Sequence, residues 1–141
     1  MSPHAVDTGM YDFAVVGVGP AGARFARPAA EARDALLARE KGEVGTPLAC
    51  SGHVSDDVWE YVPDAAREEL LQNEVYGARF RVGGPDSKPY PFYKEERVSN
   101  VIDRVELDRT LADCARAAGA DVREGHTVTG VADQERAVGR H

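Results

Sequence analysis

The sequence predicts an α/β fold that begins with a parallel βαβ unit, and three observations support this prediction. Residues 13–16 form a continuous apolar run that ends at a glycine, as expected of a buried parallel strand. Residues 20–32 have the composition of a helix and begin with Pro20, which suits the first helical position. Residues 35–39 provide a second, weaker strand, so that strand, helix and strand follow one another along the chain.

The clearest element further along is a helix over residues 103–119. Asp103 and Glu106 fit a capping box at its start, and Gly119 fits the C-terminal stop. Its apolar positions lie on one face: Leu107, Leu111, Cys114, Ala115 and Ala118. The other expected elements are a loop over 42–55, a helix over 64–72, an inserted β-hairpin region with a strand over 78–82 and a turn over 83–86, and strands over 98–102, 121–122 and 127–131.

Length and composition limit the classes of protein to consider. A chain of 141 residues is at most one domain, and 43% hydrophobic residues allow it a core. The net charge of −7 without a basic stripe argues against a nucleic-acid partner. We find no signal peptide and no apolar run of about 18 residues, and two cysteines make no disulfide framework, so we expect a cytoplasmic protein.

The charged residues are biased towards acids and arginine. The chain has 24 acidic residues, whereas only Lys41, Lys88 and Lys94 are lysines. An acidic, lysine-poor surface suits a cytoplasm with concentrated salt, such as that of a halophilic archaeon. Arginine codons of a GC-rich genome would explain the same bias, and the composition does not decide between them.

The segment Gly17–Gly22 matches the pattern G-x-G-x-x-G directly between the first strand and the first helix. Gly17 permits the tight turn, Gly19 lets the backbone approach a pyrophosphate, and Gly22 lets the helix pack closely on the strand. The amides around Ala21 then point at the phosphates from the positive end of the helix dipole. The pattern in this context predicts a Rossmann-like dinucleotide site.

Glu40 strengthens the prediction because it lies at the end of the second strand, 18 residues after Gly22. A carboxylate at this place accepts hydrogen bonds from ribose hydroxyls. It would repel a 2′-phosphate, which argues against NADP at this site. The alternative reading of Glu40 is a surface acid.

The loop over residues 47–53 is a second candidate segment. Cys50 in this loop is either a small buried hydrophobe or a thiol beside a bound ring, and taken alone it favours the first. The four histidines have no metal-ligand spacing with one another or with the cysteines, so we expect no metal site. We assign no catalytic residue from the sequence.

Taken together, five segments resemble a known family. They are G-V-G-P-A-G at 17–22, E-K at 40–41, P-x-x-C-x-G at 47–52, R-x-x-L-D-x-x-L at 104–111 and G-A-D-V at 119–122. The chain resembles the N-terminal part of the geranylgeranyl reductases, most closely the archaeal digeranylgeranylglycerophospholipid reductases. P-x-x-C-x-G is the specific part of this resemblance, since many flavoproteins share the first and fourth motifs.

The resemblance implies an incomplete, Rossmann-like FAD-binding domain of the aromatic-hydroxylase type. Members of the family saturate isoprenoid double bonds of membrane lipids, and the resemblance implies the same reaction for the intact protein. It implies FAD as the cofactor, an isoprenoid lipid substrate in the intact relative, and peripheral membrane contact; it leaves the oligomeric state open. Residues 1–10 would be a polar lead, 11–132 the N-terminal part of the FAD domain, and 133–141 an unstructured tail. The implied FAD contacts are Gly17, Gly19, Ala21 and Gly22 at the pyrophosphate, Glu40 at the ribose, Cys50, Ser51 and His53 along the loop facing the flavin, Arg104 before the second helix, and Val128 at the adenine end.

The chain departs from the family pattern at three positions in the first unit. Pro28 lies within the first helix, where it removes a backbone hydrogen bond. Arg33 stands where the family has a helix-ending glycine, and Arg39 places a charge in a strand expected to be buried on both faces. From these conflicts and the missing later FAD motif of the family, we expect a truncated, decaying or frame-shifted copy of a reductase.

Three other functions remain open from the sequence. The first is a flavin monooxygenase or halogenase of the same fold, and P-x-x-C-x-G favours the reductase over it. The second is a non-catalytic nucleotide-binding remnant. The third is the NAD-binding domain of a dehydrogenase, against which Pro20, Ala21 and the Arg104 motif weigh.

Overall fold

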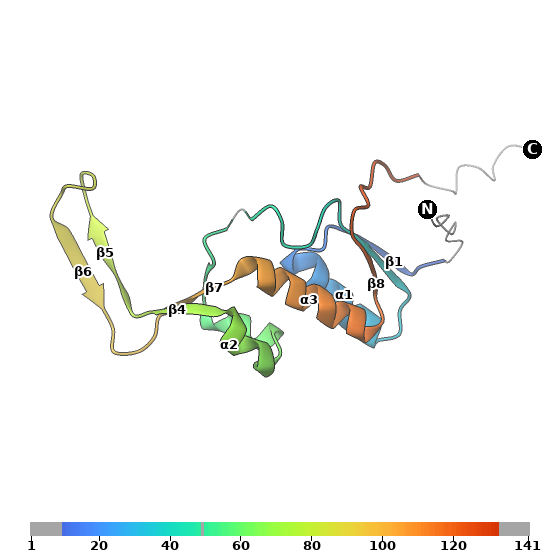
Figure 1. Cartoon of the computed structure of the whole chain (residues 1–141), viewed down its shortest axis with the longest axis horizontal. Helices are drawn as coiled ribbons and strands as arrows, with labels where there is room; N and C mark the ends of the chain where they lie inside the picture. Colours follow the sequence, from blue (N-terminus) through green and yellow to red (C-terminus); the bar gives the residue numbers. More distant parts are fainter. Residues whose placement is uncertain (1–9, 49, 133–141) are drawn as a thin grey trace, which may run out of the picture.

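A computed structural model describes residues 10–48 and 50–132 (Figure 1). The predicted lead and tail lie outside this range apart from Met10, so the division into lead, domain and tail stays a prediction. The elements in chain order are β1 (Phe13–Val16), α1 (Pro20–Glu31), β2 (Leu36–Arg39), β3 (His53–Val54), the 3-10 helices Asp56–Tyr61 and Asp64–Ala66, α2 (Arg67–Leu70), β4 (Leu71–Val75), β5 (Gly77–Arg81), β6 (Pro89–Tyr93), β7 (Ser99–Ile102), α3 (Arg104–Ala118) and β8 (Asp121–Arg123).

The first sheet is parallel and has the strand order β1-β2-β8. Helices α1 and α3 pack against each other beside it, as Figure 1 shows. The core between them is rich in alanine and contains Val18, Ala23, Ala26, Ala30, Leu36, Ala38, Leu107, Leu111, Ala112 and Ala115. These small side chains let the two helices approach closely. Two helices packed beside a parallel sheet confirm the predicted α/β fold.

Local signals explain the ends of α3. The Asp103 carboxylate accepts a hydrogen bond of 3.0 Å from the Glu106 backbone N–H, which confirms the first half of the predicted capping box. The other half differs, because the Asp103 N–H donates to the Leu70 carbonyl at 2.9 Å. Gly119 ends the helix in the left-handed region at φ 109°. The buried face includes Ala112, whereas the predicted Cys114 is only half-buried, so the packed stripe is slightly rotated from the expected one.

A second, antiparallel sheet has the order β3-β7-β4, and β5 pairs with β6 as a separate hairpin. The hairpin projects away from the helices (Figure 1). It confirms the predicted hairpin region, in which only the first strand had been assigned residues from the sequence.

Three predicted elements differ from the structure. The loop expected over 42–55 contains the short strand β3, because His53 and Val54 pair with β7. The helix expected over 64–72 is a 3-10 turn followed by the short helix α2, because Leu71 already pairs with Ile102 as the first residue of β4. Pairing with β7 thus outweighs local propensity at these two places. The residues expected as a strand over 127–131 form none, and no strand in the described part of the chain pairs with them.

Arg39 corrects a further expectation. Leu36 and Ala38 point into the core, so Leu37 and Arg39 lie on the opposite face of the sheet by the alternation of a strand. There they line a cavity of about 490 Å³ together with residues 14–16 and 127–131. Arg39 is therefore half-buried on an open face, and the charge is not enclosed on both sides.

Pro28 and Arg33 remain in the unfavourable places that the sequence indicated. Pro28 lies inside α1 with an exposed side chain, and it cannot donate a backbone hydrogen bond to the carbonyl of Arg24. Arg33 has φ 71°, in the left-handed region that glycine adopts without steric strain and that other L-residues adopt at a cost in free energy. Both residues should lower the stability of the first unit.

We expect Pro28→Ala to raise the thermal midpoint by about 10 °C, because a proline within a helix costs about 3 kcal/mol. The matched control is Pro20→Ala, since Pro20 occupies the first position of α1, where no backbone donor is needed. Calorimetric melting of both variants checks this. Equal midpoints for Pro28→Ala and the parent would show that the surrounding structure compensates for the proline.

Candidate functional site

The site lies at the carboxyl ends of the parallel strands. Gly17 follows β1 with φ 91°, and its N–H donates to the Arg39 carbonyl at 2.8 Å, which ties the turn to the end of β2. The chain after β8 returns to the same place, because the His126 N–H donates to the Glu40 carbonyl at 2.8 Å. Ligands of open parallel sheets bind at this end.

The three glycines of the turn meet different surroundings. A Cβ atom added at Gly22 would lie 2.0 Å from the Gly17 carbonyl oxygen and 3.1 Å from Val15 Cγ1, so only glycine permits this contact between α1 and β1. A Cβ atom added at Gly19 would meet nothing within 4 Å. The structure therefore bears out the packing role of Gly22 and leaves open space in front of Gly19.

Glu40 is held in place by backbone amides on both of its carboxylate oxygens. Oε2 accepts a hydrogen bond of 2.8 Å from the Val18 N–H, and Oε1 accepts one of 2.9 Å from the Lys41 N–H. The first bond couples Glu40 to the middle of the glycine turn. Glu40 is thus a structural part of the turn and not an isolated surface acid.

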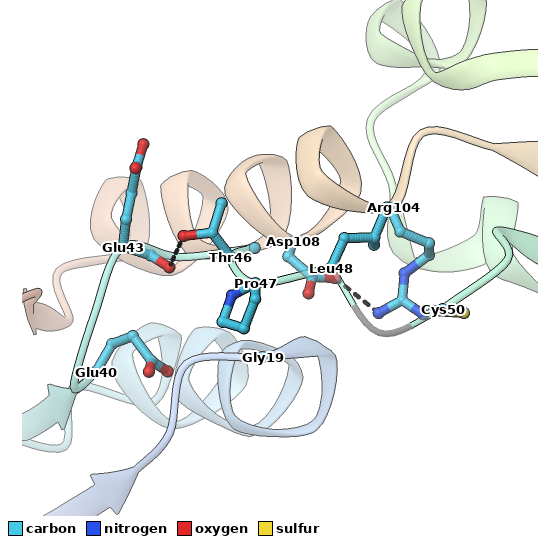
Figure 2. A pocket seen from close by; sticks show the side chains of 10 residues that line it. Gly19, Glu40, Glu43, Thr46, Pro47, Leu48, Cys50, Arg104 and Asp108 are labelled. Carbon is cyan, nitrogen blue, oxygen red and sulfur yellow. Dashed lines mark hydrogen bonds and ion pairs between the residues drawn. The ribbon is translucent and has the colours of Figure 1, made fainter.

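Two cavities meet at Glu40. One has a volume of about 250 Å³ and is shown in Figure 2; it is lined by Gly19, Glu40, Glu43, Gly45, Thr46, Pro47, Leu48, Cys50, Arg104 and Asp108. The other has about 230 Å³ and is lined by Val16, Gly17, Arg39, Glu40, Lys41, His126, Thr127 and Val128. Glu40 lines both cavities, so they lie next to each other, with Val128 in the lining of one and Gly19 and Cys50 in the lining of the other.

Arg104 and Cys50 lie in the lining of the larger of these two cavities. Arg104 donates to Asp108 Oδ1 at 2.9 Å and to Cys50 Sγ at 3.2 Å, and both charged side chains are mostly buried. Arg104 Nε is buried without a hydrogen-bond partner among the described residues. A hydrogen bond from the Gly52 backbone and the charge of Arg104 lower the pKa of the exposed Cys50 thiol.

The lowered pKa of Cys50 leads to a prediction about its reactivity. In a Cys114→Ser background, alkylation of Cys50 should reach half its maximal rate below the pH expected of an ordinary thiol, because the thiolate is the nucleophile. Arg104→Leu should move this midpoint to higher pH. Arg109→Leu on the same helix is the control, since Arg109 pairs with Glu43 at the surface. Unchanged pH profiles for Arg104→Leu would exclude the influence of Arg104 on the thiol.

The structure brings together six of the predicted contact residues around the two cavities: Gly17, Gly19, Glu40, Cys50, Arg104 and Val128. Ala21 is exposed at the start of α1, and Ser51 lines a smaller cavity of about 190 Å³ whose lining also includes Cys50. His53 lines neither of the two cavities; its Nε2 lies 2.5 Å from Ser99 Oγ within the second sheet. Contact with a cofactor stays a prediction for all of these residues and for Gly22.

Sequence reasoning missed Asp108, which fixes Arg104. The signal was present, because Asp108 lies four residues after Arg104 on the same helix and the pair therefore shares a face. The backbone of Val18 and Lys41 was also missed. Their amides orient Glu40, and no side-chain pattern reveals them.

Comparison with known proteins identifies the relatives of the chain. No family model matches it. Digeranylgeranylglycerophospholipid reductase from Thermoplasma acidophilum is 35% identical over 117 residues, which is 79% of this chain and 29% of the relative. This chain is related to the digeranylgeranylglycerophospholipid reductases. It spans less than a third of the length of that reductase.

Solved structures agree with this relationship to the reductases. A geranylgeranyl bacteriochlorophyll reductase-like protein from Thermoplasma acidophilum has a TM-score of 0.75 and 35% identity, covering 88% of this chain and 32% of that one. A halogenase in complex with phloroglucinol and FAD has a TM-score of 0.67 at 14% identity, covering 90% of this chain and 30% of that one. The second likeness shows the Rossmann-like fold that reductases and halogenases share. The resemblance noted in the sequence is thereby confirmed.

Proposed function

We propose that this chain binds the ADP half of FAD and forms the corresponding part of a flavin-dependent reductase. The observation that supports this most directly is the pair of cavities that share Glu40. Glu40 lines both cavities, whereas Val128 lines only the one and Gly19 and Cys50 line only the other. This fits a ribose at Glu40, with adenine on the Val128 side and the pyrophosphate and flavin on the other side. The alternative proposal, a flavin monooxygenase or halogenase, has the same fold but lower sequence identity behind it.

The glycine turn fits the pyrophosphate. Gly19 is the N-cap of α1 and offers no side-chain capping bond, and the first turn of the helix has no acidic residue. The positive end of the helix dipole is therefore not neutralised within the helix. With free space in front of Gly19, an anion can approach the amides of the first turn.

Glu40 fits the ribose. Each carboxylate oxygen has more than one lone pair, so the bonds from Val18 and Lys41 leave further acceptor capacity. The two amides fix the direction in which this remaining capacity points. The negative charge would repel a 2′-phosphate, which favours FAD or NAD over NADP.

Arg104 and Cys50 fit the flavin end. The ion pair with Asp108 fixes the guanidinium, and the guanidinium in turn holds the Cys50 loop against the start of α3. Bound FAD supplies hydride transfer at this place. The part of the chain's own residues is to hold the ADP half and to present a thiol of lowered pKa beside the reacting ring.

The substrate class follows from the relatives. We propose that the whole protein reduces isoprenoid double bonds of a membrane lipid, as the name of the Thermoplasma acidophilum reductase indicates for that protein. A lipid substrate implies peripheral contact with a membrane. In the described residues no helix is long and apolar enough to cross a bilayer.

We further propose that the chain is adapted to the salt-rich cytoplasm of a halophilic archaeon. The 24 acidic residues against three lysines support this proposal. The thermal midpoint should then rise continuously from dilute to molar potassium chloride, beyond the range in which charge screening saturates. A midpoint that is constant above moderate salt would favour the GC-rich genome as the origin of the bias.

The reductase proposal is tested with a chimera in which the chain replaces the matched part of the Thermoplasma acidophilum reductase. The chain alone should purify without flavin colour, because it holds only one half of the cofactor. Each hydrogen bond absent from the site is worth about 0.5–1.5 kcal/mol, so several of them lower affinity by orders of magnitude. The chimera should purify yellow and reduce the alkene. A folded chimera that excludes FAD, or full activity of the chain alone, would refute the proposal.

A further inference from the structure

Arg39 is a charged side chain without a partner beside the proposed nucleotide site. It is half-buried at the end of β2, and it forms no hydrogen bond or ion pair with any described residue. It lines the cavity of about 230 Å³ that also contains Glu40 and Val128, and the cavity of about 490 Å³ on the open face of the sheet. A cation held half-buried at a cavity without a counter-charge indicates a ligand group that contacts it.

The neighbouring strands explain why Arg39 stays unpaired. The parallel register places it between Val16 of β1 and Arg123 of β8, and side chains at paired positions of neighbouring strands lie on the same face. Arg123 Nε donates to both carboxylate oxygens of Asp121 at 3.1 Å, and another nitrogen of its guanidinium donates to the Tyr11 hydroxyl. Val16 carries no polar group in its side chain. Neither neighbour in the register therefore neutralises Arg39.

The other polar groups at the smaller cavity are already engaged or point to solvent. Both Glu40 carboxylate oxygens accept hydrogen bonds from backbone amides. His126 Nδ1 lies 2.5 Å from a backbone carbonyl oxygen two residues earlier, and Lys41 is exposed. Val16 and Val128 supply aliphatic surface to the same lining. Within the described part of the chain, the cavity thus combines aliphatic walls with a guanidinium that has no partner of its own.

We propose, on the basis of the function proposed above, that Arg39 stacks its guanidinium on the face of the adenine ring. A planar guanidinium attracts the face of an aromatic ring, and this contact needs no counter-charge. The phosphates belong on the far side of Glu40, since Gly19 lines the other cavity and not this one. The Glu40 carboxylate repels a 2′-phosphate, so the base is the group that remains for Arg39 to contact.

Arg39→Leu tests this contact through the affinity of the chain for ADP-ribose, measured by titration calorimetry. The variant should bind about 3- to 10-fold more weakly than the parent, because the leucine side chain cannot make the cation–π contact. It should melt at or above the midpoint of the parent, because an unpaired, half-buried charge is removed. A loss of affinity without a loss of stability would assign Arg39 to the ligand.

Lys41→Leu is the matched control. Lys41 lines the same cavity and carries the same charge, and the backbone N–H that it donates to Glu40 survives the substitution. Because Lys41 is exposed, the affinity should change by less than about twofold. Equal losses for Arg39→Leu and Lys41→Leu would show a general attraction between cations and phosphates, and would overturn the stacking.

NMR spectra of the Arg39 side chain report the geometry of the contact. Bound ADP-ribose should move the Nε–H proton signal to lower frequency, because ring currents shield a group that lies over the face of a ring. A hydrogen bond to a phosphate would move it to higher frequency. Arg39→Lys identifies the signal by removing it.

Four results would overturn the proposal, and they differ in what they leave standing. A shift of the Arg39 signal to higher frequency, or tighter binding of 2′-phospho-ADP-ribose than of ADP-ribose, would assign Arg39 to a phosphate. Unchanged affinity of Arg39→Leu, while Glu40→Ala still weakens binding, would remove Arg39 from the site and leave the nucleotide site itself in place. A parent chain that does not bind ADP-ribose would overturn both the stacking and the proposed function.

Discussion

Gly22→Ala should unfold the βαβ unit or leave it severely destabilised. The added Cβ would lie 2.0 Å from a backbone oxygen of Gly17, and neither α1 nor β1 can move without losing its contacts in the core. Overpacking of this kind costs about 1–3 kcal/mol or more, which is a large part of the stability of a small domain. Circular dichroism and thermal melting of the variant measure the effect.

Gly19→Ala is the matched control, and it separates folding from binding. Its Cβ meets nothing within 4 Å, so the variant should melt close to the parent. The methyl group nevertheless occupies the space through which a pyrophosphate would approach, and the corresponding chimera should lose FAD. Normal flavin content in the Gly19→Ala chimera would show that the phosphates do not lie at this turn.

Glu40→Ala should weaken binding of ADP-ribose about 10- to 100-fold. A hydrogen bond to a charged acceptor contributes about 1.5–3 kcal/mol, and the substitution also releases the Val18 amide that orients the glycine turn. Some loss of stability should accompany the loss of affinity, because Val18 is fully buried. Titration calorimetry gives the affinity, and melting gives the stability.

The control for this prediction is Glu43→Ala. Glu43 lines the same cavity, but its carboxylate pairs with Arg109 at the surface and is 61% exposed, so its removal should change little. Equal losses of affinity for Glu40→Ala and Glu43→Ala would indicate a general electrostatic effect. No loss for either would remove Glu40 from the ribose site.

The sequence predicted the first unit well because its signals are local. Glycine spacing, Pro20 at a helix start and the Asp103 cap each follow from the conformation of a few neighbouring residues. The meeting of Gly17 and Glu40 was also predictable, since the ends of parallel strands lie at one edge of a sheet. The place of Val128 beside them was implied only by the resemblance to the family.

The errors arose where tertiary pairing decides the structure. Leu71 leaves the expected helix because Ile102 offers a strand partner, and residues 127–131 stay unpaired because none is offered among the described residues. Arg39 lies on an open face that no local pattern could reveal. The strand β3 within the expected loop was missed because a two-residue strand leaves almost no signal in a sequence.

The central claim is that the glycine turn and Glu40 hold the ADP half of a flavin nucleotide. Its most direct test is a titration of the isotope-labelled 141-residue chain with ADP-ribose, followed through the backbone amide signals in NMR spectra. The account predicts that the signals of Gly19, Ala21, Gly22 and Val128 shift together and saturate, and that Glu40→Ala suppresses these shifts. Shifts confined to other parts of the chain, or none at concentrations that saturate the chimera, would contradict it.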